Sequence, residues 1–456
     1  MRFKITGGRL FCAAAGLNGR VGDLFIAGGR LVPELPEVDE VLEAHGQAVL
    51  AGGVELRAPL AGFGEHLLNL RGESLPPRQV GELYARLGYT HVHAPCLTLA
   101  TAAAVHRQLA ALAVVDASAS LVVNLRDLDL ALPDPSRREE VAETLCHLRT
   151  RTRALTLSVA EPFVCYRQEY YAHRTLPGPR ALEILAALAP HLGGRLILEA
   201  SPELLSWPLP EPGCFHLTGL SRALAGEREA KAASGLIRAG VSVDLGLAMP
   251  GPGSLPVWVE MGWFAPRCLN ARPSPEQVAR ALTVALDFPR AGVAFSTLGP
   301  LSRLERDYPR ICAWLGESGR RPREGGVAED ARSWSLLDFA YATRLLPAEI
   351  LGLPDRGRLT PGARADVALY DLPEDNAGAW PGGLTRCRTL LKAGRVIIRD
   401  YVLVDPEPPR HTVCRASPAA ETPLSRELGR SFSFRPENLW RAAETGGPWA
   451  EVGEHA

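Results

Sequence analysis

The chain has 456 residues, of which 46% are hydrophobic and 22% charged, and its formal net charge is −1. This composition indicates a globular protein with room for one large domain and a smaller one, and the balanced charge excludes the basic surface expected of a partner for nucleic acid or an anionic membrane. The nine cysteines are scattered and include no Cys-x-x-Cys pair, which predicts reduced thiols and a cytoplasmic protein. The sequence shows no long apolar run and no secretory leader, so we expect no membrane span.

Two β-rich segments lie at the two ends of the chain. The first 33 residues alternate apolar and polar side chains around Gly-Gly and Asn-Gly turns. A similar texture returns in "GRLTPGARADVALYDL" and "CRTLLKAGRVIIRDYVLV" near the C-terminus. We therefore expect one small β-sandwich domain built from both ends, residues 1–49 and 346–414, followed by an extended tail at 415–456.

The middle of the chain, residues 50–345, alternates strand-like apolar runs with helical segments. "GYTHVHAP" precedes "LATAAAVHRQLAALAVVDASA", and "ALTLSVAEPF" precedes "PRALEILAALAPHLGG". Repeated β-then-α units predict a parallel sheet, and eight such units in about 300 residues fit an α/β fold with a TIM-like (β/α)8 barrel. An open doubly wound sheet is the alternative, but no Gly-x-Gly-x-x-Gly follows the first strand.

Four segments resemble motifs of one family. "GGVELRAPLAG" at 52–62 is similar to GGVDxHxHxAG, and "LGYTHVHAP" at 87–95 to GYTxxxEP. "VSVDLGLAM" at 241–249 resembles VTVDVGQVM, and residues 335–372 resemble the long pattern SLxEIAxxTRAxPAKxLGLxDRGxLxxGAxADxxxY. On these motifs the chain resembles the A subunits of formylmethanofuran dehydrogenases and of formyltransferase/hydrolase complexes, within the amidohydrolase superfamily.

The resemblance implies a metallohydrolase of one-carbon metabolism. Members of that family cleave the N-formyl amide of formylmethanofuran or a related furan carrier to formate, or run that step in reverse, inside a multi-subunit complex. An amide is a poor electrophile, so the chemistry uses two divalent metals and a bridging hydroxide. The ligands implied are a His pair after the first barrel strand, a carboxylated Lys, two later His and an Asp.

None of these ligands stands at its position in this sequence. Arg57 and Pro59 replace the His pair; Arg keeps its proton and Pro has no side-chain donor atom. The strand at 154–163, where the Lys belongs, contains none. The later positions carry residues that do not match the family's ligands: Leu198, Glu199, Gly219 and Leu298. A binuclear site cannot form from these side chains, so we predict a degenerate, non-catalytic relative that keeps the fold.

Two other sets of residues remain candidates for a rebuilt site. His91 and His93 form the only His-x-His of the chain, and alternate residues of a strand can turn both rings to the barrel interior to bind zinc. Alternatively they are two hydrogen-bonded polar residues on one strand face. Asp244 and His216 are candidates for acid–base catalysis; the alternative for Asp244 is a strand-end carboxylate held by backbone amides.

Arg57 is also a candidate for substrate binding, because a guanidinium fork in the barrel mouth can hold an anion where the metals would supply positive charge. Otherwise it pairs with Glu55 or another carboxylate.

Three functions stay open from the sequence. The first is a scaffold without a cofactor, whose partners are the other subunits of a formyltransferase/hydrolase-type complex and a furan-type formyl carrier. The second is a hydrolase of N-formyl amides with a rebuilt site, which would hold zinc. The third is a small-anion-binding protein that uses Arg57.

Overall fold

The computed structural model describes most of the chain. The described residues are 2–58, 60, 75–99, 101–123, 134–159, 178–189, 195–249, 273–297, 301–321, 332–372, 380–405, 409–413, 422–431 and 449–451. Among the sequence positions discussed above, Pro59 and Leu298 lie outside them.

The smaller of two sheets is built from both ends of the chain, as predicted. Its strands follow the order β17-β16-β15-β14-β5-β1-β2-β3, with β4 also paired to β1. The two ends meet where β5 runs antiparallel to β14, with Leu50 opposite Ala368. The strands are β1 (Phe3–Cys12), β2 (Leu17–Ala27), β3 (Arg30–Val32), β4 (Glu40–Glu43), β5 (Ala48–Ala51), β14 (Val367–Tyr370), β15 (Thr389–Lys392), β16 (Arg395–Arg399) and β17 (Val402–Leu403).

The larger sheet carries eight parallel strands in chain order, which confirms the TIM-like α/β fold expected from the repeated β-then-α pattern. Each strand pairs in parallel with the next one along the chain. The strands are β6 (Gly53–Glu55), β7 (Tyr89–Leu97), β8 (Asp116–Val123), β9 (Thr156–Val159), β10 (Leu196–Glu199), β11 (Phe215–Thr218), β12 (Ser242–Asp244) and β13 (Val293–Ala294).

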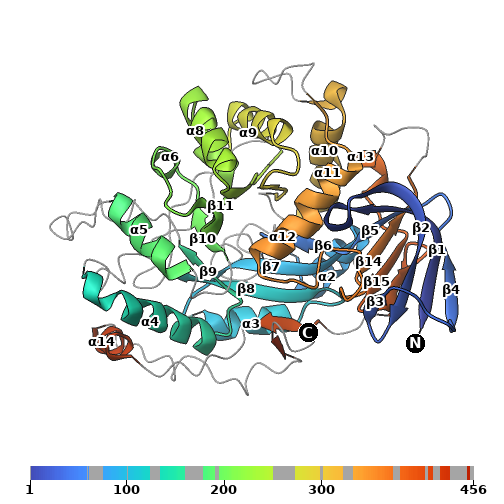
Figure 1. Cartoon of the computed structure of the whole chain (residues 1–456), viewed down its shortest axis with the longest axis horizontal. Helices are drawn as coiled ribbons and strands as arrows, with labels where there is room; N and C mark the ends of the chain where they lie inside the picture. Colours follow the sequence, from blue (N-terminus) through green and yellow to red (C-terminus); the bar gives the residue numbers. More distant parts are fainter. Residues whose placement is uncertain are drawn as a thin grey trace.

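Helices cover the outer side of this curled sheet (Figure 1). They are α2 (Pro77–Arg86), α3 (Ala102–Ala110), α4 (Arg138–Arg151), α5 (Gly178–Leu188), α6 (Pro202–Leu205), α7 (Leu220–Ala223), α8 (Glu227–Arg238), α9 (Pro275–Asp287) and α10 (Leu304–Gly316), followed by α11 (Leu336–Ala340), α12 (Leu346–Ile350) and α13 (Trp380–Gly383). Local sequence explains their starts; α9, for example, begins with Pro275 behind a reciprocal cap between Ser274 and Gln277. Within the described residues, no helix combines the length and apolar character needed to cross a membrane.

The two edge strands of the barrel, β6 and β13, are not paired with each other among the described residues. The helical segment between α11 and α12, a π-helical turn at Tyr341–Leu345 (η10), lies at this opening. The backbone N–H of Phe295 donates to the carbonyl of Ala342 over 2.9 Å, and Val54 of β6 and Ala294 of β13 share one apolar cluster with α12. The chain after the last barrel strand thus closes the barrel by packing.

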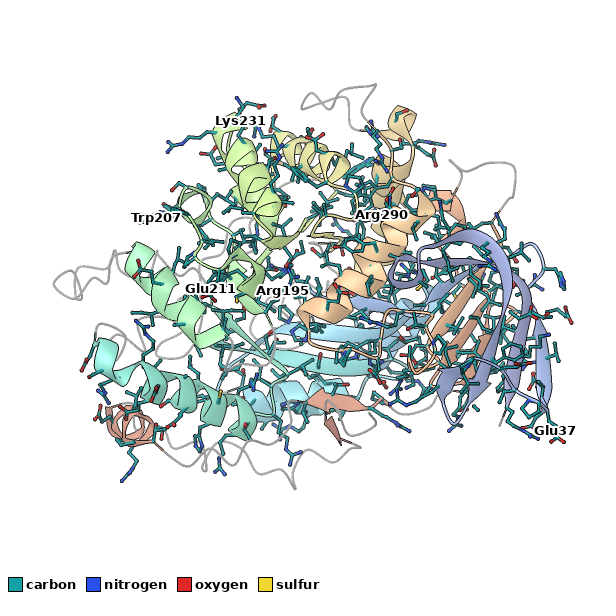
Figure 2. All side chains as sticks on the ribbon, in the orientation of Figure 1. Glu37, Arg195, Trp207, Glu211, Lys231 and Arg290 are labelled. Atoms are coloured by element: carbon teal, nitrogen blue, oxygen red, sulfur yellow. The ribbon has the colours of Figure 1, made fainter. Side chains whose placement is uncertain are left out.

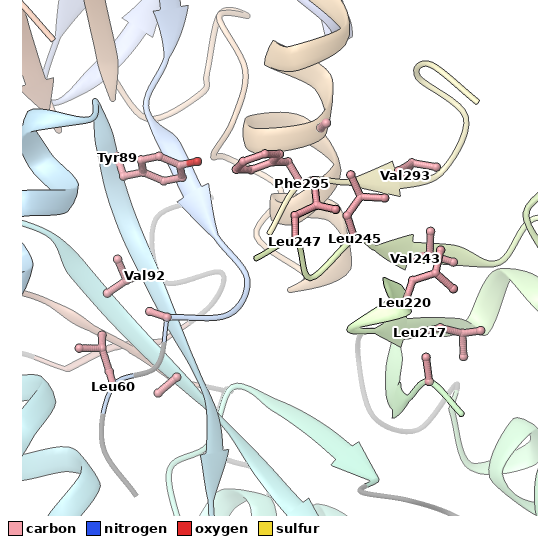
Figure 3. Packing of buried hydrophobic residues seen from close by; sticks show 14 of the residues in the cluster. Leu60, Tyr89, Val92, Leu217, Leu220, Val243, Leu245, Leu247, Val293 and Phe295 are labelled. Atoms are coloured by element: carbon pink, nitrogen blue, oxygen red, sulfur yellow. The ribbon is translucent and has the colours of Figure 1, made fainter. Parts of the chain in front are cut away.

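The main core lies between strands and outer helices. Alternate residues of a strand point to opposite faces, so one face of each strand can pack against the helices. Val92 of β7 belongs to one buried cluster with Val80 and Leu83 of α2. Figure 3 shows another part of the same cluster, at strands β11, β12 and β13. There Leu217, Val243 and Val293 lie close to Leu220, Leu245 and Phe295.

The C-terminal part of the chain adds to the larger sheet. Strand β18 (His411–Val413) pairs in parallel with β8, and β19 (Trp449–Glu451) pairs with β18. Helix α14 (Pro423–Ser431) packs on α4, where Thr422 Oγ1 lies 2.5 Å from Thr144 Oγ1. The domain boundaries expected from the sequence stay a prediction, and β18 shows that the range 346–414 also supplies a strand to the barrel sheet.

A buried ionic cluster joins the two sheets. Asp116, the first residue of β8, accepts hydrogen bonds from Arg356 (2.6 Å), Arg364 (2.8 Å) and Lys392 (3.1 Å). Arg356 and Arg364 also bind Asp366, which directly precedes β14. Burial alone would raise the pKa of Asp116, but the three cations hold it well below its ordinary value. We call these five residues the junction cluster.

Candidate functional site

Five barrel strands bring polar side chains to one edge of the larger sheet. β6, β10, β11, β12 and β13 are parallel, so their carboxyl ends meet at the mouth of the barrel, where sites of this fold lie. Figure 2 shows the described side chains on the ribbon. The opposite, amino-terminal edge of the barrel sheet is marked there by Arg195, which directly precedes β10, and by Arg290, which lies shortly before β13.

At this mouth two guanidinium groups converge on Gly219. Arg57 follows β6, and its Nη1 donates to Thr218 Oγ1 over 2.8 Å. A Cβ atom at Gly219 would lie 3.1 Å from Arg57 Nη1 and 3.0 Å from Nη2 of Arg222, on α7. Arg222 in turn forms an ion pair with Glu199 at the end of β10, over 3.1 Å. The two guanidinium groups therefore pack against Gly219 and take up the place that a side chain at this position would need.

The structure brings the two acid–base candidates together. His216 Nε2 lies 3.1 Å from Asp244 Oδ2, and both residues are buried. The other oxygen of Asp244 accepts from the Ser296 hydroxyl and from the backbone N–H of Gly219. Burial favours a raised pKa for Asp244, but the hydrogen bond and charge of His216, the charge of Arg57 and the Ser296 hydroxyl hold it below its ordinary value. Both carboxylate oxygens are thus engaged within the protein.

Contacts run from Ser242 to His216 and from His216 to Asp244, as between the serine, histidine and aspartate of a hydrolase triad. The serine hydroxyl, however, is not accessible to a substrate. Ser242 Oγ lies 3.0 Å from His216 Nδ1, on the side of the ring opposite to Asp244. A serine nucleophile must be reached by its substrate. Ser242 is completely buried at the start of β12, and its hydroxyl also donates to the carbonyl of Phe215. These contacts fix the strands β11 and β12 against each other.

Glu55 is a second buried carboxyl group at the mouth. Its Oε1 accepts a hydrogen bond from the backbone N–H of Arg57 over 3.0 Å. The pairing of Arg57 with Glu55 considered from the sequence is therefore a hydrogen bond to the backbone of Arg57. Burial raises the pKa of Glu55 to about 8, with the charge of Asp244 adding to the rise and the Arg57 N–H and guanidinium opposing it. At neutral pH this group is therefore mostly protonated, and the ionised carboxylate whose charge acts on Arg57 is that of Asp244.

His91 and His93 lie deeper in the barrel, in a network of hydroxyl groups. His91 Nε2 and His93 Nδ1 each lie 2.8 Å from Ser118 Oγ. His93 Nε2 lies 2.7 Å from Ser120 Oγ, which is 2.6 Å from Thr156 Oγ1. Burial lowers the pKa of His93 to about 3, and burial followed by the nearby Arg356 charge lowers that of His91. We call these residues the imidazole–hydroxyl network.

This network is an arrangement for neutral rings. Each ring nitrogen in these contacts faces a hydroxyl, which can donate or accept. Within the described residues, no group of three or more His, Cys, Asp or Glu side chains is placed to hold a metal ion. Both His side chains contact Ser118, and whether they bind a metal stays a prediction.

Sequence reasoning missed several residues of the mouth and the network. Arg222 stands on a short helix without a motif, and Ser296 is an ordinary strand-end serine. The hydroxyls of β8 and β9 did leave a signal, because "DASAS" places small polar residues at alternate positions. Of the positions that the sequence predicted to replace ligands, Leu198 is buried in the core and Glu199 binds Arg222.

Comparison with known proteins finds sequence similarity over most of the chain. No protein-family model matches it. The chain is 26% identical to the A subunit of the formyltransferase/hydrolase complex Fhc of Methylorubrum extorquens, over 89% of both proteins. It is 32% identical to "Protein FwdA" of Methanocaldococcus jannaschii over 117 residues, which are 22% of this chain and 20% of that protein. The resemblance predicted from the four motifs is thereby confirmed.

Solved structures confirm the fold. A chain in the crystal structure of the FhcABCD complex from Methylorubrum extorquens with methylofuran superposes with a TM-score of 0.81 at 23% identity, over 99% of both chains. Atrazine chlorohydrolase TrzN of Arthrobacter aurescens, in a structure complexed with zinc and atraton, gives a TM-score of 0.53 at 15% identity, over 88% of this chain and 96% of that one. A β-aspartyl dipeptidase of Fervidobacterium islandicum gives 0.52 at 14%, over 89% of this chain and 99% of that one.

Proposed function

We propose that this chain serves as an A-type subunit of a formyltransferase/hydrolase-type complex and has no hydrolytic activity of its own. The similarity to the Fhc protein of Methylorubrum extorquens over 89% of both proteins supports the first part. The observation that carries the second part is the pair of guanidinium groups, Arg57 and Arg222, that converge on Gly219 at the barrel mouth.

The residues at the mouth do not fit a pair of divalent cations. At about 4 Å and an effective dielectric constant of ~20, a divalent cation and one guanidinium repel each other by roughly 8 kcal/mol. The carboxylate of Asp244 is occupied by His216, Ser296 and the Gly219 N–H. A cation here would have to displace these donors and approach Arg57 and its neighbour Arg222. We therefore derive no hydrolytic step through a metal.

In this proposal the fold is retained for assembly. The related crystal structure is of a complex, FhcABCD, with methylofuran. By that likeness, the partners proposed for this chain are the other subunits of such a complex, and a furan-type carrier is the ligand that the assembly would handle. The barrel, the smaller sheet and the C-terminal segment would then provide surfaces that position these subunits.

The test combines metal analysis, activity and assembly. The full chain, expressed in zinc-supplemented medium, should contain far less than one zinc per chain by plasma mass spectrometry and should release no formate from an N-formyl amide probe. The Fhc protein of Methylorubrum extorquens to which the chain is similar, prepared in parallel, is the reference for both measurements. Co-expression with the other subunits encoded by the same organism should yield a stable complex.

Two results would contradict the proposal. Stoichiometric zinc with formate release by the isolated chain would favour the alternative, a hydrolase rebuilt around His216 and Asp244 or around His91 and His93. Failure to assemble with any of the other subunits would remove the scaffold role.

A further inference from the structure

Strand β8 shares one of its edges between two neighbours. β9 pairs with the later half of the strand, Ser120–Val123, whereas β18 pairs with its beginning, with His411 opposite Ala117. The backbone N–H of Ala117 donates to the carbonyl of Arg410 over 3.0 Å, and the backbone N–H of Arg410 donates to Asp116 Oδ1 over 3.0 Å. β18 therefore takes an edge position of the barrel sheet that β9 does not reach.

This position places two imidazole rings against each other in the core. His411 of β18 is 2% exposed, and His106 of α3 is 1% exposed. Their ring centroids lie 6.0 Å apart, and the ring planes are inclined by 30°. His106 Nε2 lies 2.7 Å from the carbonyl oxygen of Thr152, directly after α4, so this nitrogen carries a proton and donates it. Two titratable rings thus form part of the contact between α3 and β18.

The charges around the two rings come from three further elements. Arg153, just after α4, acts on His106, and Asp116 at the start of β8 acts on His411. On β19, Glu451 stands two positions beyond the residue that pairs with His411. Protonation of both rings would bring two positive charges together close to Arg153, and the carboxylate of Asp116 is already shared by the three cations of the junction cluster.

Both rings are therefore neutral while β18 is docked. Burial lowers the pKa of His106 to about 4, with the charges of His411 and Arg153 adding to the fall and the bond to the carbonyl oxygen opposing it. Burial also lowers the pKa of His411, against a hydrogen bond with the backbone of Leu109 and the charge of Asp116. Release of β18 would expose both rings to water, where their ordinary pKa is 6.5. The released state thus binds more protons, and docking weakens as pH falls from about 6.5 towards about 4.

We infer that His106 and His411 form an acid-sensitive latch, which holds β18 on the barrel sheet while both rings are neutral and releases it when they take up protons. Release leaves the beginning of β8, at Asp116 and Ala117, as an open strand edge. The inference goes beyond the scaffold role and does not rest on it.

Hydrogen–deuterium exchange of the full chain, followed by mass spectrometry at pH 7.5 and pH 4.5, tests the latch. Exchange times are scaled to the intrinsic exchange rate at each pH. We expect the protection of a peptide spanning 409–413 to fall at least about tenfold at the lower pH, because one pKa unit corresponds to a factor of ten in the docking equilibrium. A peptide spanning β14 should keep its protection, since the cations around Asp116 keep this carboxylate ionised at both pH values.

Three variants identify the rings that carry the effect. His411→Phe keeps an aromatic ring that takes up no proton, and His106→Gln keeps a donor for the carbonyl of Thr152. Each should reduce the fall in protection of 409–413, and the double variant should abolish it. His45→Gln is the matched control, because this histidine is 71% exposed beside Glu43, and it should leave the fall unchanged. If the double variant does not fold, His106→Gln alone decides.

Three outcomes would overturn the inference. The first is equal protection of 409–413 at the two pH values in the unmodified chain. The second is an unchanged fall in protection in a folded variant of His106 or His411. The third is an equal loss of protection in β14, which would mean that the chain unfolds as a whole. None of them bears on the proposed scaffold role, which is judged by zinc content and by formation of the complex.

Discussion

At the barrel mouth, Arg57 packs against residue 219, so the presence of Arg57 limits the size of the residue that position 219 can hold. Arg57 Nη1 lies 3.1 Å from the point where a Cβ at Gly219 would stand, which is tighter than an ordinary contact. A side chain at 219 would require the flexible ends of Arg57 and Arg222 to shift, and the φ of +72° at this position favours glycine as well.

Glu55 gives a prediction at the same scale. Its pKa is about 8 in the folded chain against an ordinary value of 4.5, because it is buried. The folded state thus binds one more proton than the unfolded state between these pH values, and stability falls as pH rises from about 4.5 to about 8. One pKa unit corresponds to about 1.4 kcal/mol, so this loss amounts to a few kcal/mol.

The variant Glu55→Gln should remove that part of the pH dependence. Urea unfolding of the variant at pH 5 and pH 8 should show a smaller loss of stability on raising the pH than the unmodified chain shows. Glu139→Gln, at an exposed position of α4, is the matched control and should keep the original dependence. An unchanged slope for Glu55→Gln would mean that the carboxyl group is ionised in the folded state.

Among the elements, β7 and β8 show how small hydroxyl side chains make part of a barrel interior polar. Small residues of β8 alternate, with Ala117 and Ala119 in the apolar core and Ser118 and Ser120 bonded to the rings of β7. Barrel interiors are usually filled with branched apolar side chains. Here hydroxyl groups contact three of the four ring nitrogens of His91 and His93, and burial lowers the pKa of both rings so that they stay neutral.

Among the described side chains of helix α14, Leu424 is the apolar one that lies in the core. Leu424 is completely buried, and its N–H donates to Glu140 of α4 over 2.7 Å. Leu424→Ala should cost about 2–5 kcal/mol in the docking of this helix. We expect much faster cleavage of the C-terminal segment in limited proteolysis, with a smaller change in the global melting temperature.

The control for this variant is Glu427→Gln. This variant breaks only an exposed ion pair, in which Arg137 Nη2 lies 3.3 Å from Glu427 Oε2. Such a pair contributes at most about 1 kcal/mol to the free energy of unfolding. Equal proteolysis rates for the two variants would contradict the docking role of Leu424.

At the scale of the whole molecule, the junction cluster couples the two sheets. Asp116 begins a barrel strand, whereas Lys392 ends a strand of the smaller sheet and Asp366 directly precedes another. All three side chains are buried. The cluster contains three cations and two carboxylates, so removal of one carboxylate leaves buried positive charge without compensation.

Asp116→Asn should therefore destabilise the chain by about 3–5 kcal/mol in urea unfolding at pH 7. Because the cations lower the pKa of Asp116, its contribution to stability is present above the ordinary carboxyl pKa and is lost as pH falls. The variant should thus lose less stability on acidification than the unmodified chain. Asp355→Asn, which affects a half-exposed pair with Arg30 at 3.6 Å, should have little effect at either pH.

The sequence alone predicted the parallel barrel sheet and the origin of the smaller sheet in both ends of the chain, and the prediction that the metal ligands are replaced also comes from the sequence. Hydrophobic periodicity reports local structure directly, and whether residue 57 can bind a metal depends only on its being an arginine. The alternation of His91 and His93 also predicted their common face.

Only the tertiary structure decided which distant residues these side chains meet. Arg57 meets Thr218 across 161 positions of the chain, and Asp116 meets Arg356 across 240. Neither pair has a local pattern, because such contacts form only when the barrel curls and the chain after it returns to close the gap between β6 and β13. The same folding packs two guanidinium groups, from Arg57 and Arg222, against Gly219 at the barrel mouth.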